Sequence, residues 1–186
     1  MRTLVLGGIR SGKSRWAEDA IAESTGAGQP VRYVATGAAP EGDADWSARI
    51  AAHRARRPSY WSTVETTDIP TQLRSQIATT TLVDDIGGWL TAVMDRHGAW
   101  AMGSVGSVTA DVDDLIDAVG AFPSPLALVS PEVGLTVVPH SASGRRFADE
   151  LGSLNQRLAG LCDRVVLVVA GQPLTLKVPS RAESRR

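Results

Sequence analysis

The stretch Gly7-Gly8-Ile9-Arg10-Ser11-Gly12-Lys13-Ser14 decides the fold. It matches the phosphate-binding loop pattern G-x-x-x-x-G-K-[S/T], in which glycines let the backbone curl around phosphate oxygens. The stretch lies between an apolar run at 2–6 and a helical pattern at 14–23, which is the context that this motif requires. The sequence therefore predicts a loop that binds the phosphates of a nucleoside triphosphate, with a glycine-rich turn as the alternative.

Three side chains are expected to act on the phosphates or on Mg²⁺. Lys13 is expected to reach the β and γ phosphates and to assist catalysis, and the Ser14 hydroxyl is expected to join the Mg²⁺ shell. Such a site also needs an acid at the end of a neighbouring strand, and Asp84 follows the apolar run Thr-Leu-Val. Asp84 is the predicted magnesium acid and Asp85 is its competitor, while a helix N-cap or a turn acid is the alternative for either.

Strand-like and helix-like segments alternate along the chain. The predicted strands are residues 2–6, 31–35, 79–83, 126–130 and 164–170, and the predicted helices are residues 14–23, 43–57, 89–94, 108–119 and 147–161. This order predicts an α/β fold with a mostly parallel sheet, helices on both faces and ligands at the carboxyl ends of the strands. We expect one P-loop NTPase domain over residues 1–178 and a polar tail over residues 179–186.

Composition argues against several other classes of protein. A formal net charge of −1 among 186 residues gives no global attraction to nucleic acid or to an anionic membrane. The single cysteine, Cys162, excludes an intrachain disulfide and a cysteine-based zinc site, and it is typical of a reducing compartment. No apolar run approaches the roughly 20 residues of a membrane span, and no signal-like segment precedes the first strand. We therefore expect a cytoplasmic protein.

The segment at 43–57 differs from the other predicted helices because it is strongly basic. Its cations suit the phosphates of a second nucleotide or of a product, and they are Arg49, His53, Arg54, Arg56 and Arg57. His53 adds a nucleophile, since a neutral imidazole can form a phosphoramidate and split nucleotidyl transfer into two displacements. A solvated basic helix face with an incidental histidine explains the same residues, so both interpretations stay open.

Further strings of residues accompany the phosphate-binding loop. They are Tyr33-Val34-Ala35-Thr36, Arg49-Ile50, His53-Arg54, Arg57-Pro58, Trp61, Glu65, Leu82-Val83-Asp84, Glu132-Val133-Gly134, Val138-Pro139 and Asn155-Gln156. In this order they resemble the bifunctional adenosylcobinamide kinase and adenosylcobinamide-phosphate guanylyltransferase family of cobalamin biosynthesis. The resemblance extends over nearly the whole chain.

This resemblance implies two reactions and their cofactors. The hydroxyl of adenosylcobinamide is phosphorylated by ATP or GTP with Mg²⁺, and GMP is then transferred from GTP to that phosphate through a histidine, here His53. The resemblance also implies a recombinase-type ATPase fold and a homo-oligomer whose subunit interfaces help to form the sites. The nucleotide contacts that it adds to the loop are Ala35, Thr36, Gly37, Arg54, Glu65 and Asp84.

Three positions depart from the family pattern. Two adjacent histidines often follow the Arg-Ile pair and the first is guanylylated, whereas this chain has Ala51-Ala52-His53. Either His53 takes over from one residue further along, about 100° around a helix, or guanylyl transfer is weakened or absent. In addition, Pro131 stands where asparagine is usual, and Asp85-Ile86-Gly87-Gly88 replaces a more hydrophobic stretch.

Two other functions stay open at the level of the sequence. One is a P-loop kinase for another small-molecule alcohol, and the other is a nucleotide-dependent switch without catalysis.

Overall fold

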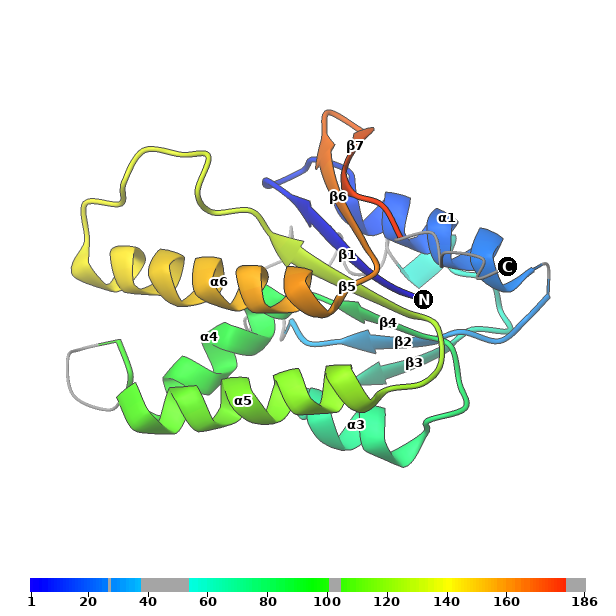
Figure 1. Cartoon of the computed structure of the whole chain (residues 1–186), viewed down its shortest axis with the longest axis horizontal. Helices are drawn as coiled ribbons and strands as arrows, with labels where there is room; N and C mark the ends of the chain where they lie inside the picture. Colours follow the sequence, from blue (N-terminus) through cyan, green and yellow to red (C-terminus); the bar gives the residue numbers. More distant parts are fainter. Residues whose placement is uncertain (27, 38–53, 101–104, 180–186) are drawn as a thin grey trace, which may run out of the picture.

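A seven-stranded sheet forms the centre of the structure, a computed structural model that describes residues 1–26, 28–37, 54–100 and 105–179 (Figure 1). The order of strands across the sheet is β3-β2-β4-β5-β1-β6-β7. The strands are β1 (Arg2–Gly7), β2 (Arg32–Ala35), β3 (Ser62–Glu65), β4 (Thr81–Asp84), β5 (Leu126–Pro131), β6 (Arg164–Val169) and β7 (Gln172–Lys177). The helices are α1 (Lys13–Thr25), α3 (Ile69–Ser75), α4 (Ile86–Arg96), α5 (Val105–Ala121) and α6 (Ala142–Leu161).

All neighbouring strands pair in parallel except β6 and β7, which form an antiparallel hairpin. Helix α1 lies on one face of the sheet, and α4, α5 and α6 lie on the other with α3 beside α5 (Figure 1). This arrangement confirms the predicted α/β fold with a mostly parallel sheet and helices on both faces. It also brings the carboxyl ends of six parallel strands to one edge.

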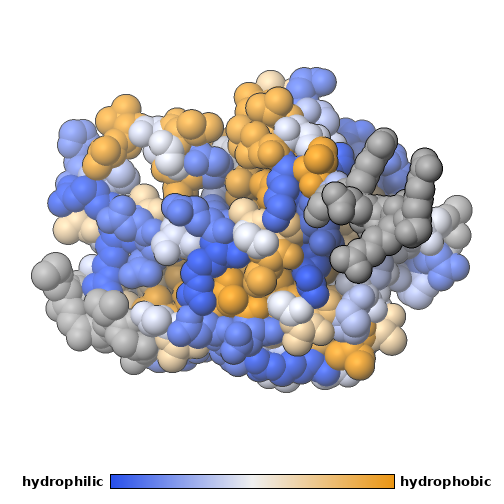
Figure 2. Space-filling model, viewed as in Figure 1, coloured by the Kyte–Doolittle hydropathy of each residue, from blue (hydrophilic) through white to orange (hydrophobic). Residues whose placement is uncertain are grey.

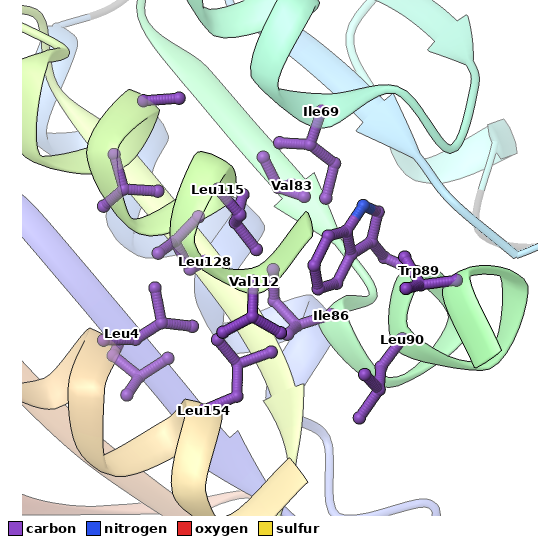
Figure 3. Close-up of a cluster of buried hydrophobic side chains, with 14 of the residues drawn as sticks. Leu4, Ile69, Val83, Ile86, Trp89, Leu90, Val112, Leu115, Leu128 and Leu154 are labelled. Carbon is purple, nitrogen blue, oxygen red and sulfur yellow. The ribbon is translucent and has the colours of Figure 1, made fainter. Parts of the chain in front are cut away.

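Each face of the sheet has its own hydrophobic core because successive residues of a strand point to opposite faces. On the α1 side, Val5 and Leu82 pack against Ala17 and Ile21. On the other side, Leu4 and Val83 belong to a larger cluster with residues of α3 to α6 (Figure 3). Trp89 is almost fully buried in this cluster.

Most predicted elements are present within a few residues of their predicted ends, and three were missed. Strand β3 is mostly exposed and every residue of β7 is exposed, so neither shows the apolar alternation of a half-buried strand. Helix α3 has seven residues, too few for a periodic pattern, although Asp68 caps it and Pro70 is in its first turn. Helix α5 begins at Val105, three residues before the start of the helix predicted at 108–119. Residues 43–53 lie outside the described ranges.

Some hydrophobic side chains remain on the surface. Figure 2 shows hydrophobic atoms over the loop between β5 and α6 and over the β6–β7 hairpin. The large exposed residues there are Leu135, Val137, Val138, Val169, Leu174, Leu176 and Val178. Within the described ranges, no helix is both long enough and apolar enough to cross a membrane.

Candidate nucleotide-binding site

Strand register places several of the predicted site residues side by side at the carboxyl edge of the sheet. Ala35 at the end of β2 is level with Glu65 of β3 on one side and with Asp84 of β4 on the other. Gly7, the last residue of β1, is level with Pro131 of β5. Because parallel strands end at the same edge, segments far apart in the sequence meet here.

The loop between β1 and α1 needs glycine at both ends. A Cβ atom on Gly7 would lie 2.7 Å from the carbonyl oxygen of Val168, closer than real Cβ contacts. Gly12 has a φ of 92°, a left-handed conformation that side chains disfavour, and a Cβ there would lie 3.2 Å from Cα of Gly171. The backbone therefore forms the close-fitting cradle that phosphate oxygens require.

The cradle presents backbone donors and a cation. Gly12, the N-cap residue of α1, has no side chain to cap the helix, and the first turn of α1 carries no acidic residue, so the helix N-terminus suits an anion. Lys13 folds back over the loop, with Nζ 3.3 Å from the carbonyl oxygen of Gly8. Gly8, Ile9 and Arg10 are exposed and Ser11 is buried.

Asp84 carries a carboxylate that is held on one side. The Tyr33 hydroxyl donates a hydrogen bond of 2.6 Å to Oδ2 of Asp84. None of the described residues donates a hydrogen bond to Oδ1, so none of them competes with a ligand for that oxygen. Ser14 is half-buried at the start of α1. Mg²⁺ is commonly held by one or two carboxylates together with phosphates and water, and the residues present fit that requirement.

Asp85, the competing acid, has a structural role. Its Oδ1 accepts a hydrogen bond of 2.9 Å from the backbone N–H of Gly88 and so caps α4. Its backbone N–H donates to the Thr36 hydroxyl at 2.9 Å, and the same hydroxyl donates to the carbonyl oxygen of Asp85. The predicted phosphate contact Thr36 thus uses its hydroxyl to brace the neighbouring strand end, while Gly37 beside it is exposed.

Asp85→Asn is expected to stabilise the fold. Burial, and next the Asp84 carboxylate, raise the pKa of Asp85 above its ordinary value, so the folded state favours the protonated acid. Wild-type stability therefore falls as the pH rises from the ordinary carboxyl pKa through the raised one, whereas asparagine keeps the cap and does not titrate. Thermal unfolding without nucleotide should show a higher midpoint for the variant at pH 8 and a smaller difference near pH 4.

The control for this prediction is nucleotide binding. Asp85→Asn should bind Mg²⁺-nucleotide as wild type does, because Asp84 is unchanged. Loss of binding in Asp85→Asn would instead assign the magnesium acid to Asp85.

Two further predicted contacts meet beside the edge strand β3. An ion pair joins Arg54 Nη2 to Glu65 Oε1 at 2.6 Å, and both side chains are mostly exposed. Such a pair contributes little to stability, so its partners can be exchanged for groups of a ligand. Residues 54–56 are helical and the helix ends before Pro58, as predicted. His53, the predicted nucleophile, lies outside the described residues.

Sequence reasoning missed one set of residues at this edge. Glu18 is only 7% exposed, and it lies in the buried stripe of α1 next to Ala17. Tyr33 is 2% exposed and points to the α1 face of the sheet with the core residues of that side. The signal for Glu18 was an acid within the apolar stripe of a helix, which is unusual unless the acid has partners.

Comparison with known proteins concerns the chain as a whole. Residues 3–176 match the family described as cobinamide kinase / cobinamide phosphate guanyltransferase. The chain is 42% identical over 180 residues to the bifunctional adenosylcobalamin biosynthesis protein CobP of Pseudomonas aeruginosa, covering 95% of this chain and 98% of the relative. It is 35% identical over 197 residues to the bifunctional adenosylcobalamin biosynthesis protein CobU of Escherichia coli, covering 95% of this chain and 100% of the relative.

Solved structures resemble the fold at much lower identity. An ATPase from the type III secretion system of pathogenic bacteria has a TM-score of 0.54 at 14% identity, covering 89% of this chain and 50% of the other. A KaiC-like protein from Pyrococcus horikoshii has a TM-score of 0.51 at 14% identity, covering 100% of this chain and 82% of the other. These likenesses concern the fold alone, and they agree with the predicted P-loop NTPase fold.

Proposed function

The chain belongs to the cobinamide kinase / cobinamide phosphate guanyltransferase family of cobalamin biosynthesis, and we propose which of its residues carry the two reactions. The observation that supports the assignment is the meeting of the glycine cradle, Asp84 and the Arg54–Glu65 pair at one edge of the sheet. One edge thus offers a site for a triphosphate and, beside it, exposed groups for a second nucleotide or a product.

In the kinase reaction, the loop of Gly7 to Ser14 binds the triphosphate of ATP or GTP. Backbone N–H groups hold the phosphate oxygens and Lys13 lies against the β and γ phosphates. Ser14 and Asp84 would hold Mg²⁺, which when bound neutralises phosphate charge. The hydroxyl oxygen of adenosylcobinamide attacks the γ phosphorus and its proton is released to water, while the bond to the β-phosphate oxygen breaks and the nucleoside diphosphate leaves.

In the guanylyl transfer, His53 is the nucleophile. Its imidazole nitrogen attacks the α phosphorus of GTP, pyrophosphate leaves, and a phosphoramidate forms. An oxygen of adenosylcobinamide phosphate then attacks the same phosphorus and releases His53, giving adenosylcobinamide-GDP. Arg54 holds phosphate, and Glu65 accepts from guanine N–H groups or from ribose hydroxyls.

A homo-oligomer in the cytoplasm is the proposed working form. The exposed hydrophobic residues of the β5–α6 loop and of the β6–β7 hairpin support this assembly, because large apolar patches often mark interaction surfaces. Light scattering coupled to size-exclusion chromatography is expected to give a mass above that of one chain, and a monomer at micromolar concentration would contradict it. The small-molecule partner is the corrinoid, and the charge of −1 offers no reason to expect nucleic acid.

An assay of products tests the proposed function. The protein is incubated with adenosylcobinamide, Mg²⁺ and either GTP or ATP, and the corrinoids are analysed by mass spectrometry. GTP should give the corrinoid phosphate and its GDP derivative, whereas ATP alone should stop at the phosphate or give nothing. Phosphate without the GDP derivative under GTP would contradict the transferase half. Absence of any modified corrinoid would contradict both halves and favour a different alcohol substrate or a switch without catalysis.

A further inference from the structure

A line of contacts between polar side chains joins α1 and the basic segment to Asp84, the proposed magnesium ligand. At one end of this line, the carboxylate of Glu18 in α1 faces two arginines of the basic segment. Arg56 Nη2 lies 3.5 Å from Oε2 of Glu18, and Arg57 Nε lies 4.0 Å from Oε1. The side chains of Glu18 and Arg57 are only 8% and 7% exposed, so this contact is shielded from water. The line therefore connects α1 to the segment that follows His53 in the sequence.

The line continues through Tyr33. The guanidinium carbon of Arg57 lies 3.4 Å from the centroid of the Tyr33 ring, which places the cation over the ring face. The hydroxyl of the same tyrosine donates to Oδ2 of Asp84. Tyr33 of β2 thus contacts the Arg57 cation through its ring and Asp84 of β4 through its hydroxyl.

The Tyr33 hydroxyl is the donor in its hydrogen bond to Asp84. A neutral phenol beside a carboxylate has only one way to bond, which is to donate its proton. The hydrogen bond therefore restrains the Asp84 carboxylate and directs Oδ1 away from Tyr33.

We propose that Tyr33 is a positioning residue for Asp84. Its hydroxyl binds Oδ2 of Asp84, so that Oδ1 is presented to the magnesium shell. The ring of Tyr33 is held by Arg57, which in turn is held by Glu18. The inference rests on the role of Asp84 in the proposed function. When one oxygen of the Asp84 carboxylate is restrained, the other points in a single direction. This favours binding of Mg²⁺, because less conformational entropy of the carboxylate is lost when it binds the ion. Tyr33 touches neither nucleotide nor metal in this assignment and acts only through Asp84.

The test is Tyr33→Phe, which removes the hydroxyl and keeps the ring under Arg57. Affinity for a non-hydrolysable GTP analogue is measured by calorimetry with Mg²⁺ and with EDTA. The gain in affinity from Mg²⁺ should fall about tenfold, as expected when a partner that orients a metal ligand is lost. Affinity in EDTA should be unchanged. Tyr60→Phe is the matched control, since Tyr60 is the other tyrosine of the chain and is 46% exposed.

A double variant separates positioning from a general structural effect. In an Asp84→Asn background, Tyr33→Phe should cause no further loss of the Mg²⁺-dependent affinity, because its effect passes through Asp84. An equal loss in that background, or an unchanged Mg²⁺ gain in Tyr33→Phe alone, would overturn the inference. If Asp84→Asn itself leaves the Mg²⁺ gain intact, the failure lies in the proposed role of Asp84. If Asp84→Asn removes the gain and Tyr33→Phe does not, only the positioning role fails.

Discussion

Lys13→Ala is expected to lower kcat/KM for corrinoid phosphorylation by roughly 10²- to 10³-fold, the range for losing one preorganised group that stabilises transition-state charge. Nζ of Lys13 already lies over the loop, 3.3 Å from the carbonyl oxygen of Gly8. In the proposed site it meets charge that develops on the β–γ bridge as the phosphoryl group leaves, and no other described lysine lies at this edge. Steady-state kinetics with adenosylcobinamide and Mg²⁺-ATP measure the loss.

The chain offers a matched control because it contains one other lysine. Lys177 Nζ donates to the carbonyl oxygens of Ala159 and Gly160 near the end of α6, beside the amino end of β6 and away from the loop. Lys177→Ala should keep kcat/KM within about twofold even if it unfolds a few degrees earlier. A Lys13→Ala variant that retains more than a tenth of wild-type kcat/KM would remove Lys13 from the catalytic set.

The phosphate-binding loop could be predicted from the sequence because its motif is a run of consecutive residues. The left-handed φ of Gly12 is a local requirement, whereas the close approach of Gly7 to Val168 and of Gly12 to Gly171 comes from the fold. The alternation of buried strands and amphipathic helices is local in the same sense, so the order of elements followed from it. Elements without a buried face, such as β3 and β7, were not predicted, since an exposed edge strand has no hydrophobic pattern to recognise.

The relations within the site depend on strand register, which local patterns do not specify. Asp84 and Asp85 are adjacent carboxylates, and either one suited the magnesium site on sequence alone. The structure separates them through their partners: Asp84 lies against Tyr33 from the neighbouring strand, and Asp85 caps the helix that follows. Thr36 is a predicted nucleotide contact, and its hydroxyl bonds to the backbone of Asp85, 49 residues further on. The contacts of Tyr33 with Asp84 and of Thr36 with Asp85 exist because β2 pairs with β4.

His53→Ala is expected to abolish the covalent GMP adduct completely while corrinoid phosphorylation stays within about threefold of wild type. The two reactions use different nucleophiles, since the substrate hydroxyl attacks in the first and the imidazole in the second. Removal of the imidazole therefore blocks only the second. The adduct is detected as a mass increase of the intact protein after incubation with GTP and Mg²⁺, it should be lost in acid, and digestion should map it to the peptide that contains residue 53.

The other two histidines of the chain serve as controls. His97 follows the last residue of α4, and its Nε2 lies 2.6 Å from Oδ2 of Asp111 in α5. His140 is exposed in the loop before α6. His97→Ala and His140→Ala should both retain the adduct. His140 is the informative one, because the loop that carries it begins at the same edge of the sheet as the P-loop. Loss of the adduct in His140→Ala together with its persistence in His53→Ala would move the relay to His140.

The meaning of the His53→Ala result depends on whether a histidine at position 52 could also form the GMP adduct. If the segment keeps the geometry of relatives that guanylylate the preceding position, the double variant Ala52→His/His53→Ala should regain the adduct. On the helix predicted for 43–57, one residue would turn a side chain by about 100°, so a site shaped around residue 53 should not accept a nucleophile from residue 52. We expect the double variant to stay unlabelled, since this chain has no histidine at position 52 and carries His53 directly before Arg54, which pairs with Glu65. Recovery of the adduct would contradict that expectation and would show that the segment can present either position to the α phosphorus.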